Sequence, residues 1–354
     1  MSRFFSEKYK TLEPYTPGEQ PQDQQYVKLN TNESPFPVSP KAAAAAAEAA
    51  KRLRLYSDPE CRILMPKFCE VFGVERDEVI FNNGSDETLN FAFMAFCDDQ
   101  HPAVFPNITY GFYPVFAEIN RVPYEEIPLR EDFTIDVDAY CGIHKTIFIA
   151  NPNAPTGIAL RPAEIERIVR SNPDNVVVVD EAYVDFGAES CLPLTKQYDN
   201  LLVVQTFSKS RSMAGARLGF GVGNPELIRD LNTIKYSTNP YNINTMTMAA
   251  AIGALEDEAY TQANCRTIQE NRTFTVDALR GMGFTILDSQ ANFIFAKHAS
   301  VDGETIYREL KKRGVLIRHF TKPIISDYNR ITIGSREQMQ TLLDTLKPIL
   351  EERA

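Results

Sequence analysis

The sequence contains few histidines, no paired cysteine motif and no excess of positive charge. Its four histidines and six cysteines are scattered over 354 residues, without a Cys-x-x-Cys or His-x-x-His-like spacing. This pattern argues against a structural metal site and predicts buried, reduced thiols. The net charge of −10 argues against broad electrostatic binding of nucleic acid. We therefore expect a protein without a metal ion and without a nucleic-acid partner.

Long hydrophobic runs are also missing from the chain. No apolar stretch reaches the roughly 18 residues that a membrane-spanning helix needs. The N-terminal segment "MSRFFSEKYKTLEPY" has neither an apolar signal core nor a small-residue cleavage site. We therefore expect a cytoplasmic protein that does not associate with a membrane.

The length and the changing pattern of the chain predict two domains preceded by an arm. A chain of 354 residues is longer than one compact core usually holds. Residues 1–40 are rich in proline and polar side chains, which predicts an extended N-terminal arm. Residues 41–261 alternate short apolar runs with helical patterns and form the expected large domain. Residues 262–354 change to the rhythm of a smaller α+β domain.

The apolar runs of the large domain predict an α/β fold with a largely parallel sheet. Residues 176–179 are four consecutive valines, which is typical of a strand buried on both faces. The expected strands cover residues 78–83, 102–106, 145–152, 175–183, 201–207 and 217–223. The expected helices cover residues 41–56, 85–96, 110–119, 161–171 and 224–236, followed in the smaller domain by 260–283 and a last helix from 337.

Reactive side chains stand where these strands end, which is where ligands bind in open α/β sheets. Lys209 follows the strand 201–207 and is surrounded by small residues, with Arg217 eight positions later. A lysine beside another cation loses its proton more readily and can then form a Schiff base with an aldehyde. The ordinary alternative is a surface lysine in a loop.

Two further strand ends carry polar groups of the same kind. Asp180 could cap the next helix, or it could keep the nitrogen of a pyridine ring protonated. Tyr183 could reach the same ring, or it could be a core tyrosine. Ser85 opens a helix whose free N–H groups could hold a phosphate, although Asp86 would repel that phosphate if it faced it.

Four motifs, taken in this order, resemble those of the fold-type-I pyridoxal-phosphate aminotransferases over essentially the whole chain. They are "NGSDE", "NPNAPTG", "DEAY" and "SKSRSMAGARLGF". The segments "LNTNESPFP", "YSDPE", "TYGFY" and "NRITIGSRE" are similar to the histidinol-phosphate aminotransferase family in particular. The resemblance implies the fold-type-I transferase fold, pyridoxal 5′-phosphate as cofactor, and an arm associated with the small domain and the active site.

The resemblance also implies a role for each matching residue near the cofactor. Lys209 would form the Schiff base, Asp180 would pair with the pyridine nitrogen, and Tyr183 would hydrogen-bond the ring oxygen O3′. Tyr110 would stack on the ring. The positions that match those near the cofactor phosphate are Ser85, Asp86, Ser208 and Arg217.

Other matching residues would serve the substrate and the assembly. Tyr56 would come from the neighbouring subunit, which implies a homodimer with shared active sites. Arg330 would bind the acidic group of the substrate, Arg318 would lie near its phosphate, and Tyr15 would close over it. One position departs from the family pattern: Ala154 stands where most relatives have an asparagine that donates to O3′. Tyr183 alone, Asn153 or a water would then hold this oxygen.

The activity implied is amino transfer between small-molecule amines and 2-oxo acids, with Lys209 as general base. The expected reaction interconverts L-histidinol phosphate and imidazole-acetol phosphate, with 2-oxoglutarate and glutamate, in histidine biosynthesis. A threonine-phosphate decarboxylase or an aromatic amino-acid aminotransferase of the same fold is an alternative. A non-catalytic regulator that binds pyridoxal phosphate is a minor one, since no DNA-binding segment precedes the motifs.

Overall fold

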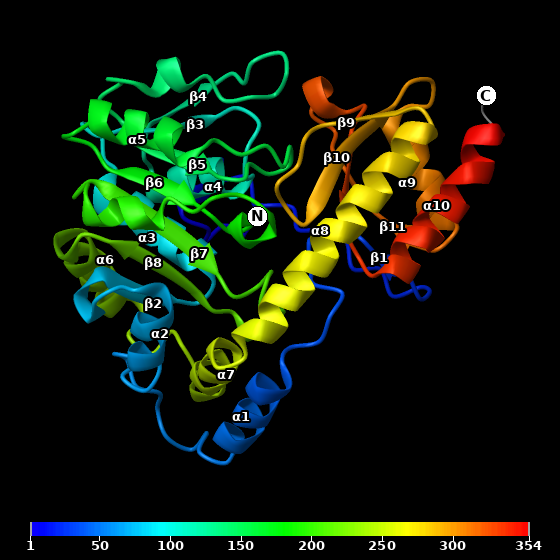
Figure 1. Ribbon diagram of the computed structural model, residues 1–354. Coiled ribbons are helices and arrows are strands. Elements are labelled where there is room, and N and C mark those ends of the chain that lie inside the picture. The colour runs from blue at the N-terminus through cyan, green and yellow to red at the C-terminus, as the bar shows by residue number, and fades with distance from the viewer. Residues whose placement is uncertain (1, 353–354) are drawn as a thin grey trace.

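A seven-stranded mixed sheet forms the centre of the larger part of the molecule (Figure 1). The computed structural model describes residues 2–352. Across the sheet the strands are β2 (Val79–Asn82), β8 (Gly219–Gly223), β7 (Leu201–Thr206), β6 (Val177–Asp180), β5 (Thr146–Ala150), β3 (Ala103–Pro106) and β4 (Tyr124–Ile127). β8 is antiparallel to both neighbours and the other pairs are parallel. The α/β fold with a mainly parallel sheet, predicted from the valine-rich runs, is confirmed.

Helices cover both faces of this sheet, which is why its strands lack an alternating polar pattern. Alternate residues of β7 show the two faces: Leu202 packs with α3 (Ser85–Phe96), α4 (Phe112–Asn120) and α6 (Pro225–Thr238). Leu201 packs on the other face, against α5 (Pro162–Ser171). A third cluster joins the β2 edge to α1 (Pro40–Ala50), α2 (Met65–Phe72) and α7 (Thr245–Leu255).

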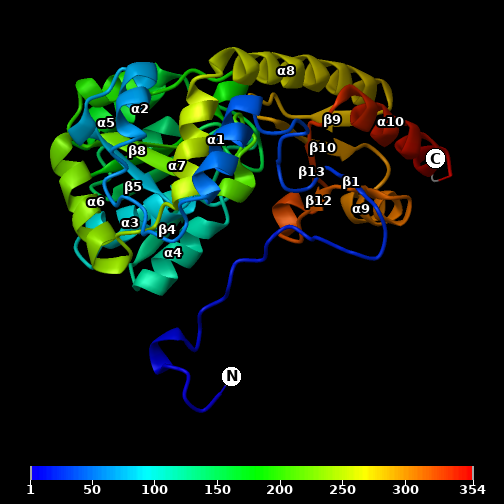
Figure 2. The ribbon, with the colours of Figure 1, turned by 90° about the horizontal axis from the view of Figure 1, so that it is seen from below.

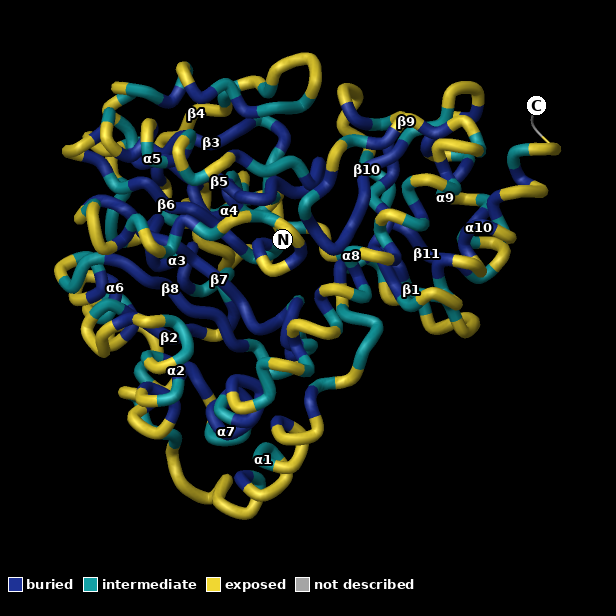
Figure 3. The backbone as a smooth tube through the Cα atoms, viewed as in Figure 1, coloured by how far each residue is buried: buried dark blue, intermediate teal, exposed yellow. Residues whose placement is uncertain are grey.

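A second, four-stranded antiparallel sheet forms the smaller part. Its order is β12 (Arg318–His319), β13 (Asn329–Thr332), β10 (Phe293–His298) and β9 (Phe284–Ile286). Its core includes residues of α8 (Glu258–Gly281), α9 (Gly303–Lys312) and α10 (Arg336–Glu351). Short 3₁₀ helices complete the chain: Glu7–Tyr9, Arg76–Glu78, Val137–Tyr140, Val184–Phe186, Leu192–Lys196, Ala214–Ala216 and Pro323–Ile325. Figure 3 shows both sheets mostly buried, with exposed residues on the loops and outer helix faces.

The helix α8 connects the two parts without a break (Figure 1). The expected domain boundary between residues 261 and 262 falls inside it, one turn after its start. The division into an arm (1–40), a large domain (41–261) and a small domain (262–354) stays a proposal, in which α8 connects the two domains.

The N-terminal arm is anchored to the smaller part of the molecule through its backbone. Its first described residues project away from the rest of the chain (Figure 2). Further on, β1 (Val27–Lys28) pairs in parallel with β11 (Val315–Leu316). Leu29 then donates its N–H to Leu316 at 2.7 Å and accepts from Thr332 at 2.9 Å. The arm is thus held by backbone hydrogen bonds, which its polar sequence does not reveal.

Several elements differ from the sequence predictions: α2 and β1 were not predicted, and three further differences have a clear physical cause. The helix expected over 41–56 ends at Ala50, because residues 51–55 are exposed and have no surface to pack against. The α7 helix was not predicted, since it is apolar on all sides and has no 3.6-residue periodicity. The edge strand β4 was missed because its "YEEI" sequence is polar and largely exposed.

Two kinds of feature are absent from residues 2–352. Within them no helix is both long and apolar enough to cross a bilayer. Across the same residues, no three His, Cys, Asp or Glu side chains form a group that could hold a metal ion.

Candidate active site

A cavity of about 640 Å³ lies at the carboxyl ends of the central strands, and the arm and the small sheet close its other sides. It brings together every candidate residue from the sequence except Tyr56. They are Tyr15, Ser85, Asp86, Tyr110, Asp180, Tyr183, Ser208, Lys209, Arg217, Arg318 and Arg330. The parallel register explains the convergence, because β5, β6 and β7 end at one edge of the sheet.

Lys209 enters the cavity from the loop that follows β7. Its Nζ lies 5.6 Å from the centre of the Tyr183 ring. The Tyr183 ring is itself held by an edge-on contact with Phe293, with the ring centres 5.0 Å apart. An amine and a phenol therefore share one wall of the cavity.

Asp180 is the last residue of β6 and is 5% exposed. It accepts hydrogen bonds from the Ala182 N–H at 3.2 Å and the Tyr113 hydroxyl at 3.3 Å. Burial, with added repulsion from Asp86, raises the pKa of Asp180 to about 7. A carboxylate buried in this way is stabilised when a cation is placed beside it, and a protonated pyridine nitrogen is such a cation.

Tyr113 was not singled out from the sequence, although it lies in the same "TYGFY" motif as Tyr110. Burial, and then the charge of Asp180, raise its pKa well above the usual range. Its hydroxyl therefore stays protonated and keeps donating to Asp180. Tyr113 is fully buried and does not line the cavity, and its ring lies edge-on to that of Tyr110 with the ring centres 5.8 Å apart.

The N-terminus of α3 and Arg217 form a pocket suited to an anion. Gly84 precedes α3 with φ +79°, and a Cβ there would lie 2.3 Å from Arg217 Nη2. Arg217 pairs with Asp86 at 3.3 Å. The Asp86 carboxylate also accepts from the Tyr110 hydroxyl at 2.6 Å. Two donors thus bind Asp86, which reduces the repulsion that it would exert on a phosphate.

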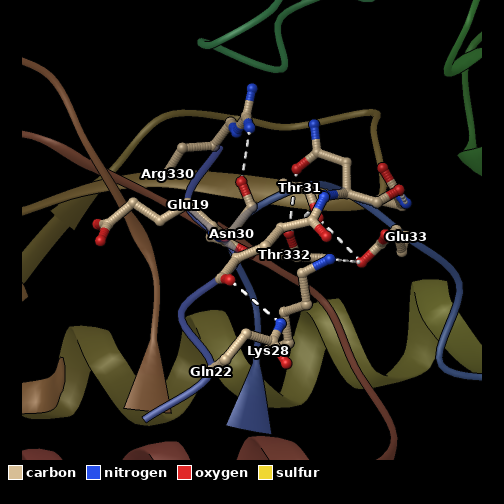
Figure 4. A network of polar contacts seen from close by, with 11 residues as sticks. Glu19, Gln22, Lys28, Asn30, Thr31, Glu33, Arg330 and Thr332 are labelled. Atoms are coloured by element: carbon tan, nitrogen blue, oxygen red, sulfur yellow. Dashed lines mark hydrogen bonds and ion pairs between the residues drawn. The ribbon is translucent and has the colours of Figure 1, made fainter. Parts of the chain in front are cut away.

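The opposite side of the cavity carries two arginines from neighbouring strands. Arg318 and Arg330 are register partners in β12 and β13. Arg330 donates to the Asn30 carbonyl at 2.9 Å, and its buried Nε has no hydrogen-bond partner within residues 2–352 (Figure 4). Burial lowers the Arg330 pKa. Arg318 donates to the carbonyls of Thr16 and Pro17, each at 3.2 Å.

The arm forms one boundary of the cavity at Tyr15. The Tyr15 ring stacks on Phe112 with the ring centres 4.1 Å apart, and lies 6.4 Å from the Tyr110 ring. Burial raises the Tyr15 pKa. The arm therefore supplies an aromatic side chain between the two arginines and the α4 end of the site.

Because Ala154 has no side-chain donor, the sequence leaves open whether Asn153 could donate to O3′ instead. The contacts of Asn153 answer this question. The Asn153 amide donates to the Ile108 carbonyl at 2.9 Å and to Thr156 Oγ1 at 3.2 Å, so both of its N–H groups are used. Asn153 therefore has no N–H group left to replace the donor that Ala154 lacks. Sequence reasoning missed Asn32, whose amide donates to the Tyr183 hydroxyl at 3.0 Å.

Tyr56 lies outside the cavity of its own chain and is 86% exposed. Its ring stacks on Tyr241 at 4.8 Å. Three large hydrophobic residues close to Tyr56 in the sequence are also exposed: Leu53, Leu55 and Ile63. Tyr241, on which its ring stacks, is exposed as well.

Comparison with known proteins gives consistent matches. The family described as "Aminotransferase class I and II" matches residues 24–346. Histidinol-phosphate aminotransferase of Brachyspira hyodysenteriae is 47% identical, over 99% of this chain and all of its own. The enzyme of that name from Clostridium acetobutylicum is 44% identical, over 98% of this chain and 99% of its own.

A solved structure agrees in fold. Histidinol-phosphate aminotransferase from Sinorhizobium meliloti, in complex with pyridoxal-5′-phosphate, superimposes with a TM-score of 0.89 at 22% identity. The match covers 100% of this chain and 99% of that one. The fold and the family match define the class, and the chain belongs to the aminotransferase class I and II family, among the histidinol-phosphate aminotransferases. The family predicted from the sequence motifs is thus confirmed.

Proposed function

We propose that this protein is a pyridoxal-phosphate-dependent histidinol-phosphate aminotransferase. It interconverts L-histidinol phosphate and imidazole-acetol phosphate, with 2-oxoglutarate and glutamate as the other pair, in histidine biosynthesis. The observation that carries the proposal is the set of charges in one cavity: an amine, a buried carboxylate, an anion pocket and two further arginines. Relatives 44–47% identical over nearly the whole chain support the choice of substrate.

The residues of the cavity fit the cofactor. Lys209 would hold it through its amine, and Asp180 would pair with its ring nitrogen. Tyr183 would donate to O3′ and Tyr110 would lie against the ring. The phosphate would bind the N–H groups at the start of α3, with Ser85, Asp86, Ser208 and Arg217 around it. When bound, the cofactor supplies an electron sink for the carbon that bears the substrate amine.

The remaining chemistry belongs to the chain itself. Lys209 Nζ accepts the proton from the amine-bearing carbon of the substrate, and in the return half-reaction it delivers one. Asp180, once beside a cation, is ionised at neutral pH and holds that cation in place. Tyr113 donates to Asp180 and fixes the orientation of its carboxylate.

Arg318 and Arg330 account for the use of two different acidic groups. The acidic group is a phosphate in one substrate pair and a carboxylate in the other. A guanidinium group binds either anion with two parallel hydrogen bonds, so the same side chains serve both pairs. Tyr15 would cover the bound substrate and keep water from the charged groups.

The proposed assembly is a homodimer with shared active sites. Tyr56 and Tyr241 stack on each other while both are exposed, and exposed aromatic side chains of this kind are often covered by a second subunit. Tyr56 would then reach the cofactor phosphate of the neighbouring copy. We also propose that the enzyme works in the cytoplasm, as the sequence predicts.

The test is to add L-histidinol phosphate to the cofactor-loaded protein without any 2-oxo acid. We expect the visible band of the bound cofactor to disappear as the amino group is transferred. Release of carbon dioxide from threonine phosphate would contradict the proposal, and so would a protein that takes up no pyridoxal phosphate. Transfer from phenylalanine or tyrosine without transfer from histidinol phosphate would also contradict it.

A further inference from the structure

The segment from Lys28 to Glu33 runs from β1 to the cavity, beside Arg330 and Thr332 (Figure 4). Asn32 lies in this segment, is 1% exposed and has a backbone φ of +55°. Left-handed backbone is tolerated by asparagine better than by most other residues. The backbone carbonyl of Asn32 accepts from the Asn292 amide at 3.0 Å. The Asn292 side chain therefore helps to hold the Asn32 backbone in place.

Thr332 determines which end of the Asn32 amide faces the cavity. Thr332 Oγ1 accepts the backbone N–H of Asn32 at 3.0 Å, so its own proton must go elsewhere. That proton goes to Asn32 Oδ1, also at 3.0 Å. With Oδ1 facing Thr332, the Nδ2 group points to Tyr183.

This orientation has a direct consequence for the Tyr183 hydroxyl. Asn32 Nδ2 donates to the Tyr183 oxygen at 3.0 Å, which makes that oxygen an acceptor on this side. A phenol has one proton, so the Tyr183 proton is directed away from Asn32 and remains available to another acceptor. The edge-on contact with Phe293 fixes the Tyr183 ring, and with it the position of the hydroxyl group.

The hydroxyl proton of Tyr183 is important because two neighbouring residues cannot donate to O3′. Ala154 has no donor, and both N–H groups of Asn153 are already used. We propose that Asn32 is a positioning residue for Tyr183, which it leaves free to donate its only proton to the cofactor oxygen O3′. This inference rests on the proposed function and concerns how the cofactor oxygen is held in a chain that lacks the usual asparagine.

The test is a double-mutant cycle between Asn32→Gly and Tyr183→Phe. Glycine accepts the positive φ of position 32, so the substitution removes the amide without straining the backbone. The readouts are the pH midpoint of the visible absorption change of the resting holoenzyme, and the dissociation constant of pyridoxal phosphate from the apoprotein. Neither readout depends on turnover.

We expect Asn32→Gly to raise the pH midpoint by roughly 0.5 to 1 unit, a three- to ten-fold change in proton affinity. The reason is that a weaker hydrogen bond leaves O3′ more basic, so that it keeps its shared proton to a higher pH. Tyr183→Phe should raise the midpoint in the same direction. In the Tyr183→Phe background, Asn32→Gly should add nothing.

Two further variants complete the design. Asn30→Ala is the matched control, because Asn30 is equally buried in the same segment but donates to the Glu19 carbonyl at 2.9 Å. It should leave the midpoint unchanged. Asn32→Asp keeps the size of the side chain and replaces the donor by an acceptor, so it serves if the glycine variant does not fold. It should raise the midpoint more in the wild-type background than in Tyr183→Phe.

Additive shifts in the cycle, or an equal shift in Asn30→Ala, would overturn the inference while leaving the proposed function intact. No shift in either Asn32 variant would do the same. A wild-type protein without a cofactor band would instead show that the proposed function has failed.

Discussion

At the scale of single residues, Asp180 has opposite effects on the empty and the loaded protein. Burial raises its pKa from the usual 3.8 to about 7 in the chain without a cofactor. Between these two values the native state binds more protons than the unfolded state does. The free energy of unfolding of the apoprotein therefore decreases as the pH rises through this range.

Asp180→Asn should remove this pH-dependent loss of stability, because an asparagine side chain does not titrate. We expect the variant apoprotein to be more stable than the wild-type apoprotein above pH 7, by up to about 4 kcal/mol, with the difference closing toward pH 4. Urea denaturation across the pH range measures it. Asp99→Asn makes the same change at an exposed position and should have little effect.

In the presence of pyridoxal phosphate the sign of the Asp180→Asn effect should reverse. The variant loses the ion pair with the ring nitrogen, so it should bind the cofactor at least about tenfold more weakly. Equal cofactor affinities for variant and wild type would contradict the role proposed for Asp180.

At the scale of elements, the start of α3 is held close to β8 by a glycine. A Cβ at Gly219 would lie 2.2 Å from the Ser85 backbone nitrogen, so a larger residue must displace the helix N-terminus. Gly219→Ala should therefore weaken cofactor binding by roughly tenfold or more, through lost hydrogen bonds to the phosphate. Titration of the apoprotein with pyridoxal phosphate measures this.

Gly215→Ala is the control for that experiment, because nothing lies within 4 Å of a Cβ at position 215. It should bind the cofactor as the wild type does. If both variants lost the same affinity, the close approach of β8 to α3 would not be the cause.

The sequence predicts those parts of the site that follow strands. Lys209 and Asp180 were found because valine-rich runs end just before them, and parallel strands end at one edge of a sheet. Asn32 could not be found in this way, since it is 151 residues from Tyr183 and meets it only through tertiary packing. Tyr113 was missed because the rotation of α4, not the motif, decides which tyrosine bonds to Asp180.

Buried strands are easier to predict from the sequence than the elements packed around them. The buried strands have an apolar run of the right length, so β5, β6 and β7 could be read from composition. The α7 helix is surrounded by other elements and has no polar face to mark its period. The pairing of β1 with β11 depends on backbone groups, which carry no sequence signal.

At the scale of the whole molecule, the proposed dimer predicts complementation between two defective chains. Lys209→Ala removes the amine of its own site, whereas Tyr56→Ala would damage the site of its neighbour. Each variant alone should therefore be inactive or nearly so. A mixed dimer contains one site with both residues intact.

Equal co-expression of the two variants should restore about one quarter of the wild-type activity, because half of the dimers are mixed and each has one intact site of two. Activity of the purified mixture measures the result. In the control, Lys196→Ala takes the place of Lys209→Ala. Lys196 is an exposed lysine paired with Glu78, so this variant should be active alone. A mixture no more active than its components would contradict shared active sites.

The way in which the arm is attached has a consequence for its evolution. Arg318 and Arg330 hold it through the carbonyl groups of Thr16, Pro17 and Asn30. Every amino acid provides a backbone carbonyl, so substitutions at these three positions leave the acceptors in place. The arm can therefore change its side chains, and with them the surface that it presents to a substrate, while the arginines continue to anchor it.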